Sequence, residues 1–279
     1  MRLCMEERLS NEIVSKDLLS QQYKSSSNLE ARISLHERFS TNPLRPHRWI
    51  FDQFDLPSHA TVLEVGGGVG KLWQDNADRL SPNWRILLTD FSAGMLEKAK
   101  QSTLTVNGQF AYSVADVTGI PFGAALFDAV IANHMLYYLA TQSDRAQALA
   151  GLRRVLKPGG KFYASTNGVN HMQAMAALVN EFDPSIPFVT QVVRNFSLES
   201  GPLEVAEWFG DVELRRYEDE LVVTDAQPLI DFILSASTIF TLAEGKKTAL
   251  SEFVRKRFVE QGSVIRIRKD SGLLCARRL

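Results

Sequence analysis

The sequence predicts an α/β protein built on a doubly wound, mainly parallel sheet, and three observations point to this class. A short run of β-forming residues, Thr61–Val65, leads into a turn that holds four glycines between Gly66 and Gly70. A helix-compatible stretch follows the turn, and strand-like and helix-like segments alternate beyond it. Such alternation is typical of βαβ units in a parallel sheet. The chain has 279 residues, 45% of them apolar, which suits one sizeable core with an attached cap.

The composition narrows the function classes. The formal net charge is −1, so there is no overall electrostatic case for binding nucleic acid or an anionic membrane surface. The two cysteines, Cys4 and Cys275, stand at opposite ends of the chain, without the spacing of a metal site. No apolar run approaches the length of a membrane span, and the amino terminus lacks the apolar core of a secretory signal. We therefore expect a cytoplasmic protein without a bound metal; a homo-oligomer is compatible with these features.

Residues 1–58 are predicted to form a mainly helical cap. One helix is expected over Leu29–Phe39 and a second over Arg48–Phe54, with two prolines between them. Aromatic and basic side chains are interleaved in this region. Two interpretations stay open, a helical layer packed on the sheet or a lid over a substrate pocket. The side chains that a lid would present are Tyr23, Arg32, His36, Phe39 and Trp49.

The glycine turn is predicted to bind a nucleotide-like ligand, because glycines let the backbone take positive φ angles and approach a ligand closely. Two well-known nucleotide motifs do not fit. A dinucleotide fingerprint needs a small residue where Lys71 stands, and a phosphate-binding P-loop needs glycine in place of Val65. The pattern that does fit is an acid followed by alternating glycines, Glu64, Gly66, Gly68 and Gly70.

Further strands are predicted over Trp84–Asp90, Phe110–Ala115 and Phe127–His134, with helices over residues 92–100 and 143–156 between and after them. A Pro-Gly-Gly stop at residues 158–160 then leads into a fifth strand. Asp90 and Asp116 follow the second and third strands. The carboxyl ends of parallel strands meet at one edge, where doubly wound folds bind ligands and a carboxylate can accept both hydroxyl protons of a ribose. A helix N-cap is the alternative role of Asp90.

The chain beyond residue 170 is predicted to contain helices over 170–182, 229–239 and 249–259 and a strand over 212–217. A late strand over 264–275 is expected to include a polar turn at Asp270–Gly272. Basic residues gather at 255–257 and 266–269. Because Arg266 and Arg268 alternate with isoleucines, we interpret them, together with Lys269, as a solvated strand face rather than a nucleic-acid surface.

Several motifs together resemble those of class I S-adenosylmethionine (SAM)-dependent methyltransferases. The acid and glycines at 64–70 match their first motif. Asp90-Phe91-Ser92 with Met95-Leu96, and Ala115-Asp116 with Ile120-Pro121-Phe122, are similar to their second and third motifs. Residues 152–160 look like their post-catalytic signature. The likeness covers about residues 55–170. It implies a seven-stranded Rossmann-like sheet whose last strand is antiparallel, with the core over 59–279 and cap insertions within about 170–262.

The resemblance implies SAM as the cofactor and S-adenosylhomocysteine as its product. In the family the glycine turn approaches the methionine part, and the first acid holds its amino group. The second motif holds the ribose and adenine, the third holds the adenine edge, and the fourth strand ends close to the sulfonium. Carried onto this sequence, the cofactor residues are Glu64, Gly66, Gly68, Asp90, Phe91, Met95, Asp116, Val117, Asn133 and His134.

The acceptor is less well defined by the sequence. His134 is the first candidate for a catalytic base because histidine titrates near neutrality, and His36 is the second. Tyr138 and His171 join the cap residues as candidate acceptor contacts. A purely structural role for each histidine stays open. Residues 133–138 lack the Asn-Pro-Pro-Tyr or Asp-Pro-Pro-Tyr signature of nucleobase and glutamine amino methyltransferases, and no acid or histidine cluster suggests magnesium.

We therefore expect methyl transfer to oxygen or nitrogen of a small, partly apolar metabolite, as in natural-product biosynthesis. Transfer to a prenyl or aromatic carbon is the alternative. An RNA or protein methyltransferase is disfavoured by the near-zero net charge, and a non-catalytic SAM-binding protein is a further alternative.

Overall fold

A computed structural model describes residues 26–186, 193–236 and 242–279, so Tyr23 lies outside the described residues. The chain divides into two compact units. Unit 1 comprises the described parts of residues 1–43, 169–194 and 218–270, and unit 2 comprises 44–168, 195–217 and 271–279. This division differs from the predicted cap boundary at residue 58, because it places residues 44–58 in unit 2.

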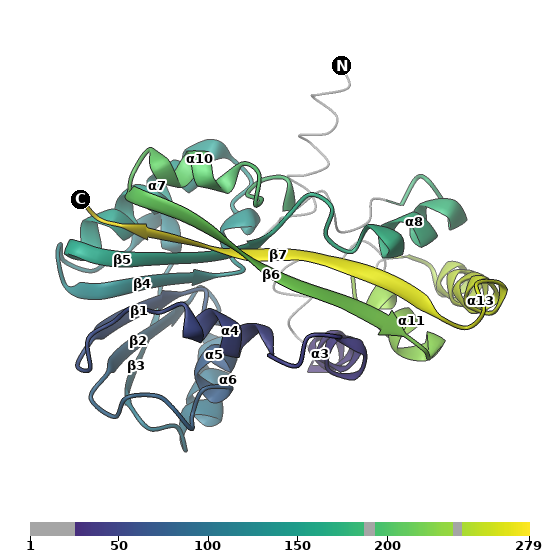
Figure 1. The fold of residues 1–279 in the computed structure, drawn as a ribbon, viewed down its shortest axis with the longest axis horizontal. Helices are drawn as coiled ribbons and strands as arrows, with labels where there is room; N and C mark the ends of the chain where they lie inside the picture. Colours follow the sequence, from purple (N-terminus) through teal and green to yellow (C-terminus); the bar gives the residue numbers. More distant parts are fainter. Residues whose placement is uncertain (1–25, 187–192, 237–241) are drawn as a thin grey trace. The chain divides into compact units, whose positions relative to one another are not determined.

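The sheet contains seven strands in the order β3-β2-β1-β4-β5-β7-β6, which confirms the predicted α/β class (Figure 1). Strand β1 pairs in parallel with β2 and β4, β2 with β3, and β4 with β5. Strand β7 runs antiparallel to β5, as predicted. The division between the units falls within β6 and β7. The strands are β1 Thr61–Val65, β2 Arg85–Asp90, β3 Gln109–Val114, β4 Phe127–Asn133, β5 Leu156–Asn167, β6 Gly210–Val223 and β7 Ile265–Arg277.

The strand order places the glycine turn at the point where ligands bind in doubly wound sheets. The chain goes from β1 to β2 and β3 on one side, and then returns to β4 and β5 on the other. The neighbouring crossovers therefore leave the sheet in opposite directions at the carboxyl ends of β1 and β4. The turn Gly66–Gly70 follows β1 at this switch point.

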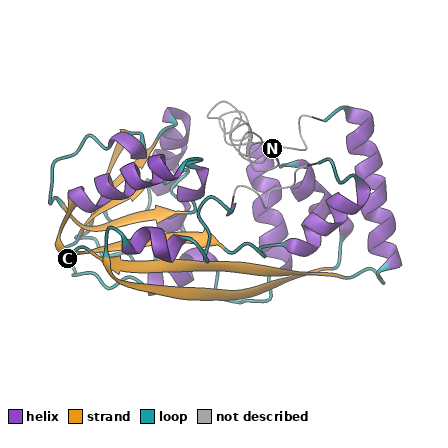
Figure 2. Ribbon diagram, turned by 90° about the horizontal axis from the view of Figure 1, so that it is seen from above, coloured by secondary structure: helices purple, strands orange, loops and turns teal. Residues whose placement is uncertain are grey.

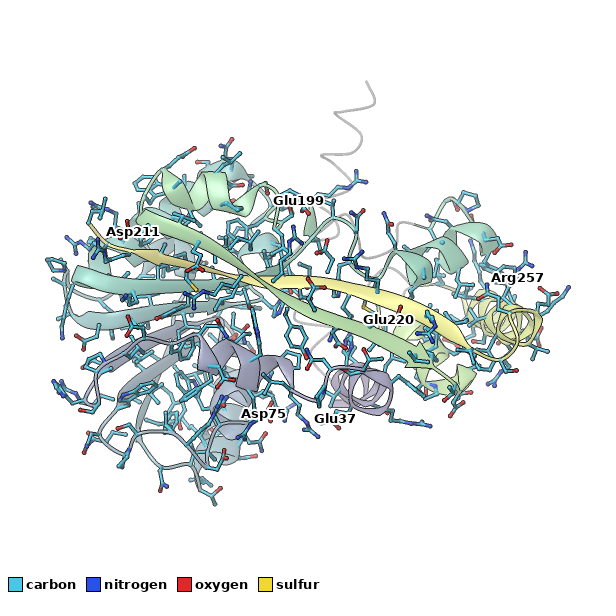
Figure 3. The ribbon with its side chains drawn as sticks, in the orientation of Figure 1. Glu37, Asp75, Glu199, Asp211, Glu220 and Arg257 are labelled. Atoms are coloured by element: carbon cyan, nitrogen blue, oxygen red, sulfur yellow. The ribbon has the colours of Figure 1, made fainter. Side chains whose placement is uncertain are left out.

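Helices cover both faces of the sheet in unit 2 (Figures 1 and 2). Alternating side chains of β1 separate the two layers, since Val62 packs with one helix layer and Leu63 with the other. Asp75, labelled in Figure 3, ties the first layer together because it accepts from His47 of α4 and from Lys71 of α5. The first layer contains α4 Pro46–Asp52, α5 Lys71–Gln74 and α6 Ala93–Thr103, and the second contains α7 Gln142–Val155 and α10 Gly201–Ala206.

Unit 1 is mainly helical and has a core of its own. Its helices are α3 Ser26–Phe39, α8 Gln173–Phe182, α11 Ala226–Leu234 and α13 Glu244–Glu260. They pack with the unit 1 parts of β6 and β7 around buried side chains such as Leu35, Leu221 and Ile267. No helix of the described residues is both long enough and apolar enough to cross a membrane.

Two predictions about the late strand are wrong. The polar turn expected at Asp270–Gly272 does not form, because β7 stays extended and Gly272 pairs with Thr166 of β5. The glycine serves a close strand approach instead, since a Cβ there would lie 2.6 Å from the backbone oxygen of Arg215. Lys269 is also not on a solvated face. Its side chain is 6% exposed and pairs with Asp219, whereas Arg266 and Arg268 are exposed as predicted.

Candidate cofactor site

The glycine turn uses conformations and contacts that other residues would not accept. Gly66, Gly68 and Gly70 have φ angles of +63°, +56° and +74°, in the left-handed region that favours glycine. A Cβ on Gly66 would lie 2.9 Å from the Cβ of Met135, so residues just after β4 pack directly against the turn. A Cβ on Gly68 would meet nothing within 4 Å. The turn is therefore tight at Gly66 and open at Gly68.

The carboxylate of Asp90 is fixed beside the open part of the turn. Its Oδ2 accepts from the backbone N–H of Gly68 at 3.0 Å, and its Oδ1 accepts from the N–H of Ser92 at 2.9 Å. Burial raises the pKa of Asp90, while hydrogen bonds from the backbone act in the opposite direction. Each carboxylate oxygen has a second lone pair for another donor. This arrangement suits a ligand with two neighbouring hydroxyls.

Glu64 is buried in the strand that leads to the turn and has a partner that the sequence analysis missed. The indole Nε1 of Trp73 donates to Glu64 Oε2 at 2.6 Å. Desolvation raises the pKa of Glu64 to about 8, against the lowering effect of this hydrogen bond. Trp73 lies on α5, which packs over β1, and its Nε1–H meets the need of a buried acid for a donor. The sequence could have predicted this pair, because a buried acid needs a donor and Trp73 stands nine positions after Glu64.

The loops after β2 and β3 offer an apolar surface and a second fixed carboxylate. The ring of Phe91 is 46% exposed, directly after Asp90, whereas Met95 and Val117 are buried. Asp116 accepts from the backbone N–H of Thr118 at 3.0 Å and so caps the short helix η1 (Val117–Gly119). An exposed aromatic ring beside a fixed acid suits a heteroaromatic base, because the ring offers a stacking face.

The end of β4 is held in a strained conformation. His134 has a φ angle of +50°, which is uncommon for a residue with a Cβ. Ser165 of β5 fixes it, because the N–H of His134 donates to the Ser165 hydroxyl at 3.0 Å and to the Ser165 carbonyl at 3.2 Å. The same hydroxyl donates to Asn133 Oδ1. Together with the Gly66–Met135 contact, this places Asn133 and His134 beside the glycine turn.

Comparisons with known proteins agree with this geometry. Residues 62–160, from β1 to the start of β5, match the family model described as a methyltransferase domain. The match spans the glycine turn, Asp90, Asp116 and the end of β4. Over residues 62–160 the chain is therefore a methyltransferase domain, and the matches support one of the class I, SAM-dependent kind.

Curated proteins that are similar to this chain include enzymes named ubiquinone/menaquinone biosynthesis C-methyltransferase UbiE. The protein of that name from Hahella chejuensis is 27% identical over 178 residues, which are 63% of this chain and 64% of the relative. The one from Ralstonia pickettii is 34% identical over 100 residues, or 36% of this chain and 40% of the relative. The chain thus spans less than two thirds of the length of these relatives.

Solved structures support the fold. A Haemonchus contortus phosphoethanolamine N-methyltransferase 2, in complex with S-adenosylhomocysteine, has a TM-score of 0.58 at 15% identity. The superposition covers 94% of this chain and 59% of the Haemonchus chain. The protein named [4+2]-cyclase SpnF has a TM-score of 0.56 at 16% identity. The superposition covers 93% of this chain and 95% of the cyclase chain. At these identities the likeness concerns the fold alone.

Unit 2 contains only part of the predicted set of site residues. The ten predicted cofactor residues lie in unit 2, as does Tyr138 of η2 (Leu136–Tyr138), whose ring is 4.6 Å from that of Tyr137. Trp49 packs on Tyr217 with a ring distance of 5.3 Å, within unit 2. The remaining candidates lie in unit 1, namely Arg32, His36, Phe39 and His171. Their roles as acceptor contacts stay predictions.

Of the unit 1 candidates Phe39 is buried, and Arg32, His36 and His171 are partly buried. Phe39 is part of the core of unit 1, and Arg32 donates to Ser235 Oγ and Ser235 O at 3.1 Å each. Desolvation lowers the pKa of His36 to about 3 and that of His171 to about 4. Among the residues that the structure describes, no group of three or more His, Cys, Asp or Glu side chains could hold a metal ion.

Proposed function

We propose that the protein transfers a methyl group from SAM to oxygen or nitrogen of a small, partly apolar acceptor, in a natural-product pathway. The observation that supports this most directly is the Asp90 carboxylate, bonded to the backbone of Gly68 at the switch point of the sheet. A ribose diol is the ligand that such a carboxylate takes in nucleoside-binding folds.

The proposal assigns each described residue of the site to a part of SAM. The backbone of Gly66 and Gly68 would lie against the methionine portion, with Glu64 holding its amino group through water. Asp90 would accept the ribose hydroxyls. The exposed ring of Phe91 would face the adenine, with Met95 beneath it. Asp116 and the Val117 amide would bond the adenine edge, and Asn133 and His134 would lie near the sulfonium.

SAM supplies an electrophilic methyl group on a cationic sulfur. The protein has to align the acceptor atom with that methyl group, exclude water and, for an acidic acceptor, remove a proton. His134 is the proposed base because the Gly66–Met135 contact keeps its backbone next to the turn. Its ring is 6.3 Å from that of Tyr137, an aromatic neighbour suited to a partly apolar acceptor.

Methyl transfer to an aromatic carbon is the second candidate. It is favoured by the name of the curated relatives, which are C-methyltransferases of ubiquinone and menaquinone biosynthesis. A role without methyl transfer is represented by the neighbour named a [4+2]-cyclase. The near-zero net charge continues to disfavour RNA and protein as substrates.

Calorimetric titration of the full chain with S-adenosylhomocysteine tests the proposal, with NAD as the control ligand. We expect saturable binding of the first ligand only. Asp90→Asn should weaken it by about 100-fold, because two charge-assisted hydrogen bonds become neutral ones. Glu97→Gln is the matched control, since this exposed acid lies on the following helix and should leave binding unchanged. Binding of NAD, or equal affinity in Asp90→Asn and wild type, would contradict the proposal.

A further inference from the structure

Trp73 connects the helix after the glycine turn to the buried acid before it. Its side chain is fully buried on α5, and its ring meets that of Phe110 of β3 edge-on at 6.2 Å. From this position the indole N–H donates to Glu64 Oε2 at 2.6 Å. An indole can only donate, so the bond fixes which carboxyl oxygen is occupied and which is left for another partner.

Glu64 lies on a central strand, immediately before the turn. Strand β1 pairs with both β2 and β4, where Glu64 stands opposite Leu88 and Ile131. The Thr89 hydroxyl donates to the Glu64 carbonyl at 3.0 Å. A Cβ on Gly67 would lie 3.0 Å from Glu64 Oε2. The carboxyl group is therefore held directly against the glycine turn.

The second carboxyl oxygen, Glu64 Oε1, is open to a ligand. The bond from Trp73 is the one hydrogen bond that the carboxyl group receives from the residues that the structure describes. Oε1 is not closed off in the core, because it is not among the buried side-chain atoms of the described residues that lack a partner. One residue beyond Gly67 the turn is open, since a Cβ on Gly68 would meet nothing within 4 Å. A ligand over the turn can therefore reach Oε1 through a water molecule.

The surroundings of Glu64 suit a cationic donor at Oε1. A buried carboxylate with one hydrogen bond is costly, and a positively charged donor offsets that cost through its charge and its hydrogen bonds. Among the described residues, Asp90 is the charged group that acts on Glu64. Burial, and then the charge of Asp90, raise the pKa of Glu64, while the bond from Trp73 lowers it. The indole thus favours the ionised carboxylate that a cation needs.

We propose that Trp73 is a positioning residue for the cofactor, because its indole N–H holds Glu64 Oε2 and so leaves Oε1 for the amino group of SAM. The inference rests on the proposed function, which assigns the methionine portion of SAM to the glycine turn. Without the indole, the carboxyl group loses the bond that orients it and stabilises its ionised form. The amino acid portion of the cofactor then binds less tightly, whereas the adenosine portion, assigned to Asp90 and the loop after β3, is unaffected.

Calorimetry of the full chain with two ligands tests the proposal. S-adenosylhomocysteine has the amino group, whereas 5′-methylthioadenosine has the same nucleoside and a thioether but no amino acid portion. Trp73→Phe should weaken binding of the first by about 10-fold, the factor for one hydrogen bond to a charged group, and of the second by less than about 2-fold. Trp84→Phe is the matched control, because Trp84 is a buried tryptophan of the same core cluster whose indole donates to the Pro57 carbonyl at 2.8 Å. It should bind both ligands within about 2-fold of wild type.

Two further measurements show whether Trp73 acts through Glu64. In a Glu64→Gln background, Trp73→Phe should change the affinity for S-adenosylhomocysteine by less than about 2-fold, because the carboxylate that the indole positions is absent. In the wild type, that affinity should rise as the pH approaches about 8, since the amino group pairs with the ionised Glu64. Binding of 5′-methylthioadenosine should not follow this rise. In Trp73→Phe the rise should move to higher pH, a change that general damage to the fold would not produce.

The outcomes separate this inference from the proposed function. An unchanged affinity of Trp73→Phe for S-adenosylhomocysteine, or an equal loss of both ligands, would overturn the role of Trp73. If Trp73→Phe does not fold, indole ¹H–¹⁵N spectra of the wild type, which has four tryptophans, give the answer. The Trp73 signal should shift with S-adenosylhomocysteine and not with 5′-methylthioadenosine, and equal shifts would overturn the role. A wild type that binds neither ligand would contradict the proposed function instead.

Discussion

The glycine turn of unit 2 and the side-chain cluster of His36, His171, Asp219 and Lys269 in unit 1 are built in different ways. The turn is made of backbone, with three positive φ angles and a carboxylate that accepts from N–H groups within a stretch of residues 66–92. The cluster is made of side chains that come from α3, β6 and β7 and from the segment before α8. A site made of backbone depends on neighbouring residues and can be recognised as a sequence motif. A site made of side chains from distant segments has no characteristic spacing in the sequence.

The two regions also respond to pH in opposite directions. Glu64 keeps its proton in the folded chain up to about pH 8 but loses it near pH 4.5 when unfolded, so its contribution to stability falls as pH rises through that window. His36 and His171 stay neutral in the folded chain down to about pH 3 and 4, but their unfolded forms protonate near pH 6.5. Their contribution falls as pH drops below 6.5.

The largest effect is expected from breaking the buried pair in unit 1. Asp219→Ala leaves Lys269 buried without its carboxylate and should lower the free energy of unfolding by about 3–5 kcal/mol. Urea titration followed by circular dichroism measures the change. Glu220→Ala is the control, because Glu220, labelled in Figure 3, is the next residue of β6 and pairs with an exposed Arg266. That variant should lose less than about 1 kcal/mol. Equal losses in the two variants would mean that burial of the pair does not matter.

A smaller effect is expected from the glycine turn, where two substitutions separate strain from contact. Gly66→Ala combines a positive φ with a clash at Met135 and should cost about 2–4 kcal/mol. Gly68→Ala has the positive φ alone and should cost about 1 kcal/mol. Urea unfolding gives both values. A smaller loss in Gly66→Ala than in Gly68→Ala would contradict the close contact between the turn and the end of β4.

The pH dependence of stability that we expect from unit 2 can be tested at Glu64. Gln cannot ionise, so Glu64→Gln should remove the decline in stability between pH 4.5 and about 8, a change of a few kcal/mol at the upper end. Unfolding by urea at several pH values in this range measures the slope. Glu97→Gln, an exposed acid, should keep the wild-type slope. A Glu64→Gln slope equal to that of wild type would show that Glu64 ionises normally in the folded chain.

Much of the fold and part of the candidate site were accessible from sequence, for physical reasons. Strand patterns and glycine spacing are local, so β1 to β5 and the place of Asp90 beside the turn followed from short stretches. Trp73 and Ser165 were missed because their partners, Glu64 and His134, are chosen by packing between elements. Asp270–Gly272 has the composition of a turn, but Gly272 is needed for the close approach of Arg215. Lys269 was misassigned because alternation along β7 does not reveal a buried carboxylate from β6.

The smallest effect on stability, and the most specific one on function, is expected at Ser165. Ser165→Ala removes the hydroxyl that accepts from the His134 N–H, while the Ser165 carbonyl still accepts from it. The hydroxyl's bond to Asn133 Oδ1 is lost as well, but Asn133 is partly exposed and water can replace that bond. We therefore expect a loss of about 1 kcal/mol in the free energy of unfolding. Binding of S-adenosylhomocysteine should stay within about 2-fold, because Asp90 and the glycine turn are untouched.

If His134 acts as the base, a small displacement of its backbone should lower the rate of methyl transfer far more than it lowers affinity. Ser165→Thr keeps the hydroxyl and should restore the rate, which separates the hydrogen bond from the loss of side-chain volume. The measurement is turnover of labelled SAM with an acceptor once one is found, compared with His134→Gln as a function of pH. If Ser165→Ala and Ser165→Thr turn over as fast as wild type, the fixed orientation of His134 has no part in the reaction, and the strained end of β4 is a structural feature only.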